Sequence, residues 1–316
     1  MKKIYKIVCI GGGTGLSKLL GGLKLYFSDI SAIVAMTDDG LSTGRIRRDF
    51  NTLPSGDIRK CLTSLSEDKV LKQVFDYRFQ RGKGLAKHSL GNLIILALEK
   101  ITGNYDDAIS EASKILKIKN KVIPSTLENV NLGGKLDNGT IVIGERKLFL
   151  AGIKSRIIKV WTVPQNVRAN PKALMAIEKS DIIIIGPGSF YTSIVPNILL
   201  PEIRDKIVLN KSAKKIYVCN VSTERGETQG YSVEDHIDAL NNYIGSNVLD
   251  YCLINNKVVI QSKKEYKLGE VKNITTDKKF FCGCKLVLDD LIDIDNPLYH
   301  NSIKLVRAIR KIIYES

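Results

Sequence analysis

Apolar positions follow two periods along this chain. Residues 4–10 form a β-rich run that ends at a row of glycines, and a second apolar run covers residues 30–36. Between them, apolar residues recur at the i, i+3, i+4, i+7 spacing of an amphipathic helix: Leu16, Leu19, Leu20 and Leu23. A strand, a helix and a second strand in this order predict the first βαβ unit of a parallel sheet.

The same alternation returns further along the chain. Residues 89–101 have the apolar face of a helix, and the predominantly apolar runs at 181–185 and 215–221 are typical of strands buried on both faces. From about 119 to 163 the pattern changes to short β-like runs around an Asn138-Gly139 turn. The sequence therefore predicts an α/β, Rossmann-like, doubly wound and mostly parallel sheet with a small β-rich insertion at about 119–163.

No linker divides the chain, so we expect residues 1–316 to form a single nucleotide-binding domain. Its C-terminal part, 255–316, shows only one clear signal, a basic amphipathic helix at 303–314. No stretch approaches the roughly 20 apolar residues that cross a bilayer, and the first residues lead into a β-rich run instead of a signal-peptide core. We therefore expect a cytoplasmic location without membrane insertion.

The formal net charge is +15, which suits phosphate-bearing ligands. The lysines are spread along the chain among acidic residues, and no helix-turn-helix, zinc-finger or RNP signature accompanies them, so nucleic-acid binding is not expected. The six cysteines include a Cys282-Gly-Cys284 pair, but no second Cys/His pair is spaced to complete a four-ligand zinc site. The sequence leaves the presence of a metal unknown.

The glycine loop at residues 11–15 carries the strongest chemical signal. Consecutive glycines let backbone N–H groups approach an anion, and the helix after them directs its positive dipole end to the same place. Thr14 adds a hydroxyl donor, but no Lys-Ser/Thr pair follows, and Leu16 replaces the third glycine of the dinucleotide fingerprint. The alternative is a glycine turn that only allows tight packing of the strand against the helix.

Polar residues follow other predicted strands and begin other helices. The Asp38-Asp39-Gly40 segment can bind sugar hydroxyls or a divalent ion, or can be a solvated turn. Arg45 suits a phosphate, and Asp57 is either a ligand contact or a helix cap. His88 and Asn92 lie at a helix start. A second anion-friendly turn follows a buried strand: Gly186, Gly188 and Ser189, with Tyr191 and Thr192 just beyond.

Six segments together resemble the YvcK family, the gluconeogenesis factors. They are IGGGTGL from Ile10, DDG from Asp38, PSGDIR from Pro54, HSLGN from His88, GPGSFYTSI from Gly186, and Cys219-Asn220 with GET from Gly226. The resemblance covers residues 4 to about 254 and fades beyond Asn255. It departs at Leu41, where the family usually has glycine.

The resemblance implies a Rossmann-like protein related in fold to 2-phospho-L-lactate transferase. Family members bind UDP-sugars, notably UDP-N-acetylglucosamine, and support cell-wall synthesis and cell shape on gluconeogenic carbon sources. The residues predicted to bind the nucleotide or its phosphates are Gly11, Gly12, Gly13, Thr14, Gly15, Asp38, Asp39, Gly40, Arg45, Asp57, His88, Asn92, Gly186, Gly188, Ser189, Tyr191, Thr192 and Asn220.

Two functions remain open at this point. The first is a UDP-sugar-binding regulator without turnover, which requires no cofactor, acts through a protein partner in cell-wall synthesis and forms a homo-oligomer. The second is a phosphotransferase in which Asp38 or Asp39 binds Mg²⁺ and His88 is an acid-base group. No clear nucleophile supports catalysis, so the sequence favours the regulator.

Overall fold

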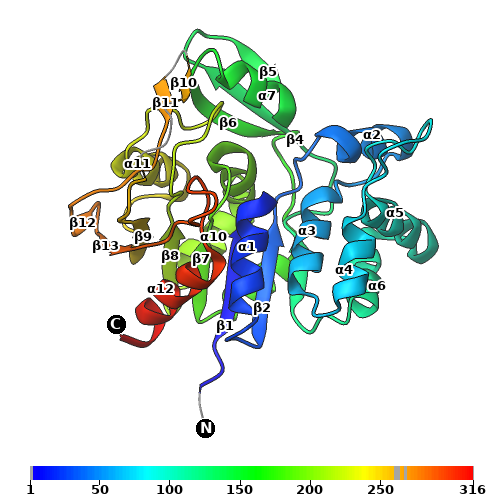
Figure 1. The fold of residues 1–316 in the computed structure, drawn as a ribbon, viewed down its shortest axis with the longest axis horizontal. Helices are drawn as coiled ribbons and strands as arrows, with labels where there is room; N and C mark the ends of the chain where they lie inside the picture. Colours follow the sequence, from blue (N-terminus) through cyan, green and yellow to red (C-terminus); the bar gives the residue numbers. More distant parts are fainter. Residues whose placement is uncertain (1–2, 260–263, 267–268, 316) are drawn as a thin grey trace.

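The computed structural model describes residues 3–259, 264–266 and 269–315. A central eight-stranded sheet has the order β12-β13-β9-β8-β7-β1-β2-β3 (Figure 1). Its strands are β1 (Lys6–Gly11), β2 (Asp29–Val34), β3 (Lys121–Pro124), β7 (Ile182–Ile185), β8 (Lys214–Val218), β9 (Tyr251–Asn255), β12 (Phe280–Phe281) and β13 (Cys284–Asp289). All pairings are parallel except that of β12 with β13, which confirms the predicted mostly parallel sheet.

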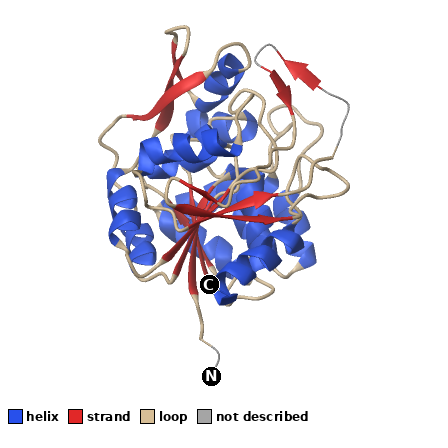
Figure 2. Cartoon of the chain, turned by 90° about the vertical axis from the view of Figure 1, so that its left-hand side faces the viewer, coloured by secondary structure: helices blue, strands red, loops and turns tan. Residues whose placement is uncertain are grey.

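Helices cover both faces of this sheet in the edge-on view of Figure 2. They are α1 (Gly13–Leu23), α2 (Leu41–Phe50), α3 (Gly56–Leu65), α4 (Lys69–Asp76), α5 (Leu90–Thr102), α6 (Tyr105–Ile115), α8 (Pro171–Glu178), α9 (Val195–Ile198), α10 (Pro201–Leu209), α11 (Val233–Ile244) and α12 (Ser302–Glu315), with a π-helix η1 (Phe190–Ile194). Because both faces are covered, the all-isoleucine strand β7 is completely buried.

The predicted insertion is a small antiparallel sheet of order β5-β4-β6. It contains β4 (Asn131–Leu136), β5 (Ile141–Ile143), helix α7 (Glu145–Gly152) and β6 (Ile157–Val163). The expected hairpin turn joins β4 to β5, and Gly139 adopts a φ of +85° there. The sheet begins later than residue 119, because β3 pairs in parallel with β2 and belongs to the main sheet.

The C-terminal part adds two features. A separate antiparallel pair consists of β10 (Lys264–Tyr266) and β11 (Gly269–Val271). The closing helix α12 packs on α1, where the Ser302 hydroxyl donates a hydrogen bond of 2.6 Å to the carbonyl oxygen of Lys18. None of the helices that the structure describes has the length and apolar character needed to cross a membrane.

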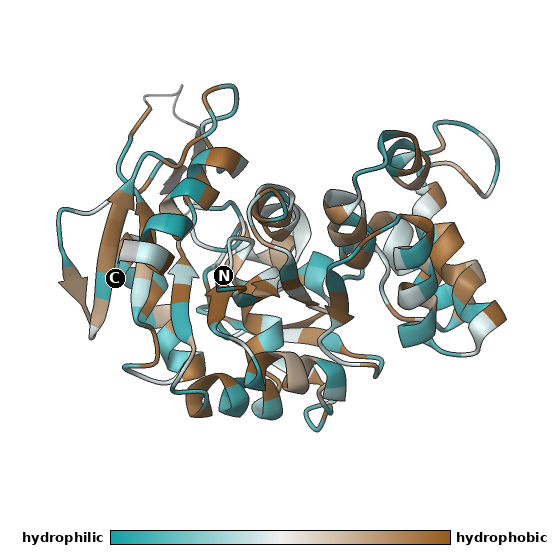
Figure 3. Ribbon diagram, turned by 90° about the horizontal axis from the view of Figure 1, so that it is seen from below, coloured by the Kyte–Doolittle hydropathy of each residue, from teal (hydrophilic) through white to brown (hydrophobic). Residues whose placement is uncertain are grey.

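The colouring of Figure 3 shows how the pattern of apolar residues produces this architecture. Apolar segments predominate in the strands, and the surrounding helices carry both apolar and hydrophilic segments. On α1, the leucines that recur in the sequence at helical spacing are all fully buried. The sheet therefore forms the core, and its loops remain available for chemistry.

Candidate functional site

A cavity of about 890 Å³ lies beyond the carboxyl ends of β1, β7 and β8. In open parallel sheets, this is where ligands bind. The structure brings together nine of the predicted residues as its lining: Gly13, Thr14, Gly15, Asp38, Asp57, Gly188, Ser189, Thr192 and Asn220. The two glycine turns that the sequence places 175 residues apart, counted from Gly13 to Gly188, thus face one cavity.

The first glycine turn opens helix α1 into this cavity. Gly12 precedes the helix, and Gly13 has a φ of +64°, a region that favours glycine. A carboxylate already occupies part of this helix end, because the Gly13 N–H donates a 2.6 Å hydrogen bond to Oδ2 of Asp57. The exposed Thr14 lies at the opening. Gly15 has a packing role, since a Cβ there would lie 2.5 Å from the carbonyl oxygen of Pro187.

Asp57 belongs to an electrostatic cluster on the cavity wall. Its Oδ1 accepts a 2.9 Å hydrogen bond from the Lys60 ammonium group. Burial alone would lower the pKa of Lys60, but Asp57 and Asp38 outweigh it and raise that pKa. Burial, and then repulsion from Asp57, raise the pKa of Asp38 to about 6. Burial also raises the pKa of Glu145, with Asp38 and Asp57 adding to the effect.

The second glycine turn is fixed by side chains from the segment after β8. The Asn220 amide both accepts from the Gly188 N–H (3.3 Å) and donates to the Gly188 carbonyl (2.9 Å). The Ser189 hydroxyl donates to Glu224 at 2.6 Å. Glu227 accepts from the Tyr191 N–H at 2.7 Å and from the Thr192 hydroxyl at 2.5 Å. This turn is therefore already well supplied with hydrogen-bond partners.

Other predicted residues lie beside the cavity without lining it. Gly11 ends β1, and its carbonyl accepts hydrogen bonds from the Ala35 N–H and the Asn197 amide. Gly40 caps α2 and donates its N–H to Asp38 at 2.8 Å. Asp39 turns to the insertion, where it accepts the Arg146 N–H at 2.9 Å. Gly186 has a φ of +80° in the second turn.

Arg45, His88 and Asn92 gather instead in a separate cluster between α2 and α5. Nδ1 of His88 is 3.1 Å from the Ser42 hydroxyl, which in turn is 3.4 Å from the Asn92 amide nitrogen. Burial, followed by repulsion from Arg45, lowers the pKa of His88. Arg45 donates to the Ala86 carbonyl at 2.6 Å. These contacts make the cluster a hydrogen-bonded support for the loop after α4.

Tyr191 faces away from the cavity. Its hydroxyl lies 2.8 Å from that of Tyr231, in a second hollow that is lined also by residues of β6 and α11. The structure thus places the π-helix η1 between two hollows, with Thr192 facing the first and Tyr191 facing the second.

The cavity also has charged and aromatic walls that the sequence reasoning missed. These residues are Lys60, Glu145, Phe149, Glu224, Arg225, Tyr299 and His300. They come from four separate segments, and none belongs to a local pattern that marks a ligand site. For Lys60 alone a signal existed, because it directly follows the PSGDIR segment.

Four carboxylates line the cavity and could contribute ligands to a cation: those of Asp38, Asp57, Glu145 and Glu224. Mg²⁺ commonly binds one or two carboxylates together with substrate phosphates and water, and Asp38 and Asp57 have the donor atoms for this. Within the described part of the chain, no three His, Cys, Asp or Glu side chains are arranged to hold a metal by themselves. Cys282 is exposed and Cys284 is buried.

Comparison with known proteins identifies the family of this chain. The model of the family described as 2-phospho-L-lactate transferase CofD matches residues 7–292. A protein named gluconeogenesis factor from Halalkalibacterium halodurans is 40% identical over 98% of this chain and 96% of its own length. Another protein of that name, from Bacillus subtilis, is 38% identical over 98% of both chains. The chain belongs to the gluconeogenesis-factor family.

The fold of this family member also matches a solved structure. A crystal structure of a Bacillus halodurans protein has a TM-score of 0.90 at 38% identity and covers 98% of this chain and 100% of the other.

The departure from the family pattern at Leu41 has a consequence for the backbone. Leu41 is exposed and has a φ of +39°, which is unfavourable for a side chain with a Cβ. A glycine would adopt this conformation without strain.

Proposed function

We propose that this member of the gluconeogenesis-factor family binds a UDP-sugar, UDP-N-acetylglucosamine in the first place, and acts as a regulator of cell-wall synthesis and cell shape during gluconeogenic growth. The ligand is bound and released unchanged. Its binding energy shifts the protein towards a state that a protein partner recognises. A homo-oligomer in the cytoplasm is the expected form.

One observation carries this proposal. The N-terminus of α1, with Thr14 at its opening, and the Gly188-Ser189 turn face the same cavity of about 890 Å³. A helix N-terminus attracts phosphate, and volumes of about 300–1,000 Å³ are usual for small-molecule sites. The cations Lys60 and Arg225 on the wall suit a diphosphate, and Phe149 and Tyr299 offer apolar surface to a base or sugar.

A specific observation favours the alternative, a phosphotransferase. Burial and the neighbouring Asp57 raise the pKa of Asp38 to about 6, which places its titration near neutral pH. Such a carboxyl can accept a proton from an attacking hydroxyl, or can bind Mg²⁺ when ionised. His88, the acid-base group that the sequence offered, is tied to Ser42 outside the cavity, so Asp38 is the better candidate.

Calorimetric titration separates the two functions. The purified chain is titrated with UDP-N-acetylglucosamine, UDP-glucose, GDP and NAD, each with and without Mg²⁺, and the recovered ligand is analysed by chromatography. We expect saturable binding of a UDP-sugar that is recovered intact. Preference for GDP, or conversion of the ligand only when an acceptor is added, would establish the transferase instead.

A further inference from the structure

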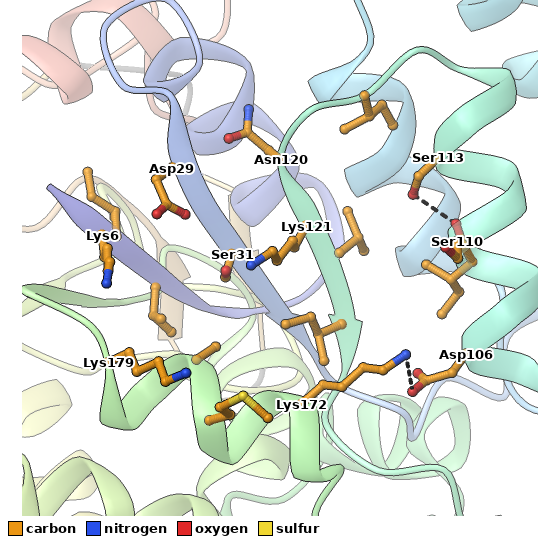
Figure 4. A pocket seen from close by; sticks show the side chains of 18 of the residues that line it. Lys6, Asp29, Ser31, Asp106, Ser110, Ser113, Asn120, Lys121, Lys172 and Lys179 are labelled. Carbon is orange, nitrogen blue, oxygen red and sulfur yellow. Dashed lines mark hydrogen bonds and ion pairs between the residues drawn. The ribbon is translucent and has the colours of Figure 1, made fainter. Parts of the chain in front are cut away.

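A second cavity of about 550 Å³ lies at the opposite, amino-terminal end of the sheet. Its floor is formed by the starts of β1, β2 and β3, and its walls are α6 and α8 (Figure 4). We call it the α6/α8 groove. Its size is in the usual range for a small-molecule site, and none of its lining residues is shared with the cavity at the carboxyl ends.

The floor of the α6/α8 groove contains a polar residue where the strand pattern calls for an apolar one. Ser31 is the Cα partner of Val8 on one side and of Lys121 on the other, so the three side chains share one face of the sheet. Ser31 is only 6% exposed, and its hydroxyl has no hydrogen-bond partner among the described residues. Ser31 lines the groove, so its hydroxyl is available to donate a hydrogen bond to a ligand oxygen.

The groove is also rich in cations. Five lysines and two aspartates line it. Two of the positive charges are offset, because Lys172 forms a 3.0 Å ion pair with Asp106 and Lys114 pairs with Glu111 at 2.6 Å. Asp29 is the cross-strand partner of Lys6. Among the described residues, the ammonium groups of Lys6, Lys121 and Lys179 have no hydrogen bond or ion pair, and of these three Lys6 has a carboxylate, Asp29, as its strand neighbour.

The remaining walls are apolar. Ile109 and Ile118 contribute on the α6 side, and Met175 and Ala176 contribute from α8. Met175 is half exposed, and its flexible thioether adapts to varied shapes. In Figure 4, the side chain of Lys121 ends next to Ser31, its strand partner, and Lys179 extends from the side of α8. A ligand must therefore combine a negative head group with an apolar body.

We propose that the α6/α8 groove is a second binding site, for a small amphipathic anion. The head group, a phosphate or carboxylate, bonds Lys121, Lys179 and the Ser31 hydroxyl, while a short aliphatic or aromatic body lies against Met175 and Ile109. The site is independent of the nucleotide-sugar cavity. It gives the protein a means of sensing an acidic metabolite at the far end of the same sheet.

Octyl phosphate is a suitable probe, and calorimetric titration at low salt is the measurement. We expect saturable binding that is at least about tenfold tighter than that of uncharged octanol, because a bond to a charged group contributes more than a neutral one. The double variant Lys121→Gln/Lys179→Gln should weaken binding about tenfold, and Ser31→Val about fivefold. Raising the salt concentration should weaken binding to the wild-type protein.

A matched control is the double variant Lys135→Gln/Lys279→Gln. It removes two exposed lysines that lie outside the groove and should leave binding unchanged. Thermal unfolding of each variant shows whether the fold is intact. The proposal is overturned by any of three results: no saturable binding, equal loss in both double variants, or binding only to phosphatidylglycerol vesicles and not to soluble octyl phosphate.

Discussion

Each of the two glycine turns beside the large cavity leads into a helix, and a carboxylate accepts a backbone N–H at the start of each helix. The surroundings of these two carboxylates differ. At α1, Asp57 accepts the Gly13 N–H, and Lys60 neutralises Asp57 across 2.9 Å. At η1, Glu227 accepts the Tyr191 N–H. Burial, followed by the neighbouring Glu224, raises the pKa of Glu227 to about 8.

This difference separates an exchangeable site from a fixed one. Asp57 lines the cavity beside a lysine, so an incoming phosphate can compete with it for the positive end of α1. Glu227 is buried and does not line the cavity, so it anchors η1 from within. The comparison teaches that a glycine turn at a strand end is not enough to define a ligand site. The role of the turn depends on whether the carboxylate at its helix start is ionised and on whether that carboxylate lines the cavity.

Gly13→Val tests the exchangeable turn most severely. A β-branched residue at a φ of +64° is strained, and its side chain would extend towards the cavity. We expect about a 100-fold loss of UDP-N-acetylglucosamine affinity by calorimetry, from lost charge-assisted hydrogen bonds. Gly103→Val is the matched control, because Gly103 has a φ of +84° with open space around it at the end of α5. Equal affinities in the two variants would remove α1 from the site.

Glu227→Gln tests the fixed turn through stability. Because the pKa of Glu227 rises from 4.5 to about 8 on folding, the folded state binds more protons in this window, and stability decreases as pH rises through it. The glutamine side chain of the variant does not titrate, so the variant does not lose stability in this way as pH rises. We expect the unfolding free energy of the variant, relative to wild type, to increase by about 1–3 kcal/mol between pH 5 and 9.

Chemical denaturation across this pH range measures the effect. Glu202→Gln replaces another carboxylate that accepts a backbone N–H, that of Ala169, and serves as its control. A difference between Glu227→Gln and wild type that stays constant with pH would show that Glu227 is ionised in the folded protein.

Asp57→Asn should increase the affinity of the turn at α1 for anions. Removal of the negative charge beside Gly13 leaves Lys60 free to bind a phosphate, so we expect about fivefold tighter UDP-N-acetylglucosamine binding without Mg²⁺. Asp68→Asn is the control: Asp68 also caps a helix, α4, and pairs with a lysine, Lys117, but lies outside the cavity. Weaker binding in Asp57→Asn alone would show that Asp57 contacts the ligand or its cation favourably.

Asp38→Asn should give the smallest effect. The pKa of Asp38 is about 6, so its negative charge develops as pH rises from 5 to 7. Without Mg²⁺ we expect the affinity for a UDP-sugar to decrease about threefold over this range in the wild type and to stay constant in the variant. Asp39→Asn should retain the wild-type slope, because Asp39 accepts the backbone N–H of Arg146 and does not line the cavity.

Local patterns account for the parts of this structure that the sequence predicted. The apolar period of α1 and the Asn138-Gly139 hairpin each depend on neighbours within a few residues, and the structure confirms them. The strand order beyond the first βαβ unit depends on crossover connections between strands that are far apart in the sequence. The sequence pattern therefore assigned β3 to the insertion, although β3 pairs with β2 in the main sheet.

The site was harder to predict because its contacts are long-range. Asp57 was expected to cap its own helix or to bind the ligand, but it accepts an N–H from a residue 44 positions away. His88 follows a pattern suited to phosphate, yet its neighbours in space, Ser42 and Arg45, come from a helix that the motif does not include. Sequence patterns show which residues lie at strand ends, whereas packing decides which of them face the cavity.

The contact between α12 and α1 has a consequence for how the protein matures. Ser302 and Val306 pack so closely on Gly22 that a Cβ at Gly22 would lie 2.6–2.8 Å from them. Helix α1, which carries the glycine loop, cannot complete its packing until residues 302–315 have been synthesised and have left the ribosome. The glycine loop near the start of the chain therefore depends on a helix that lies far along the sequence.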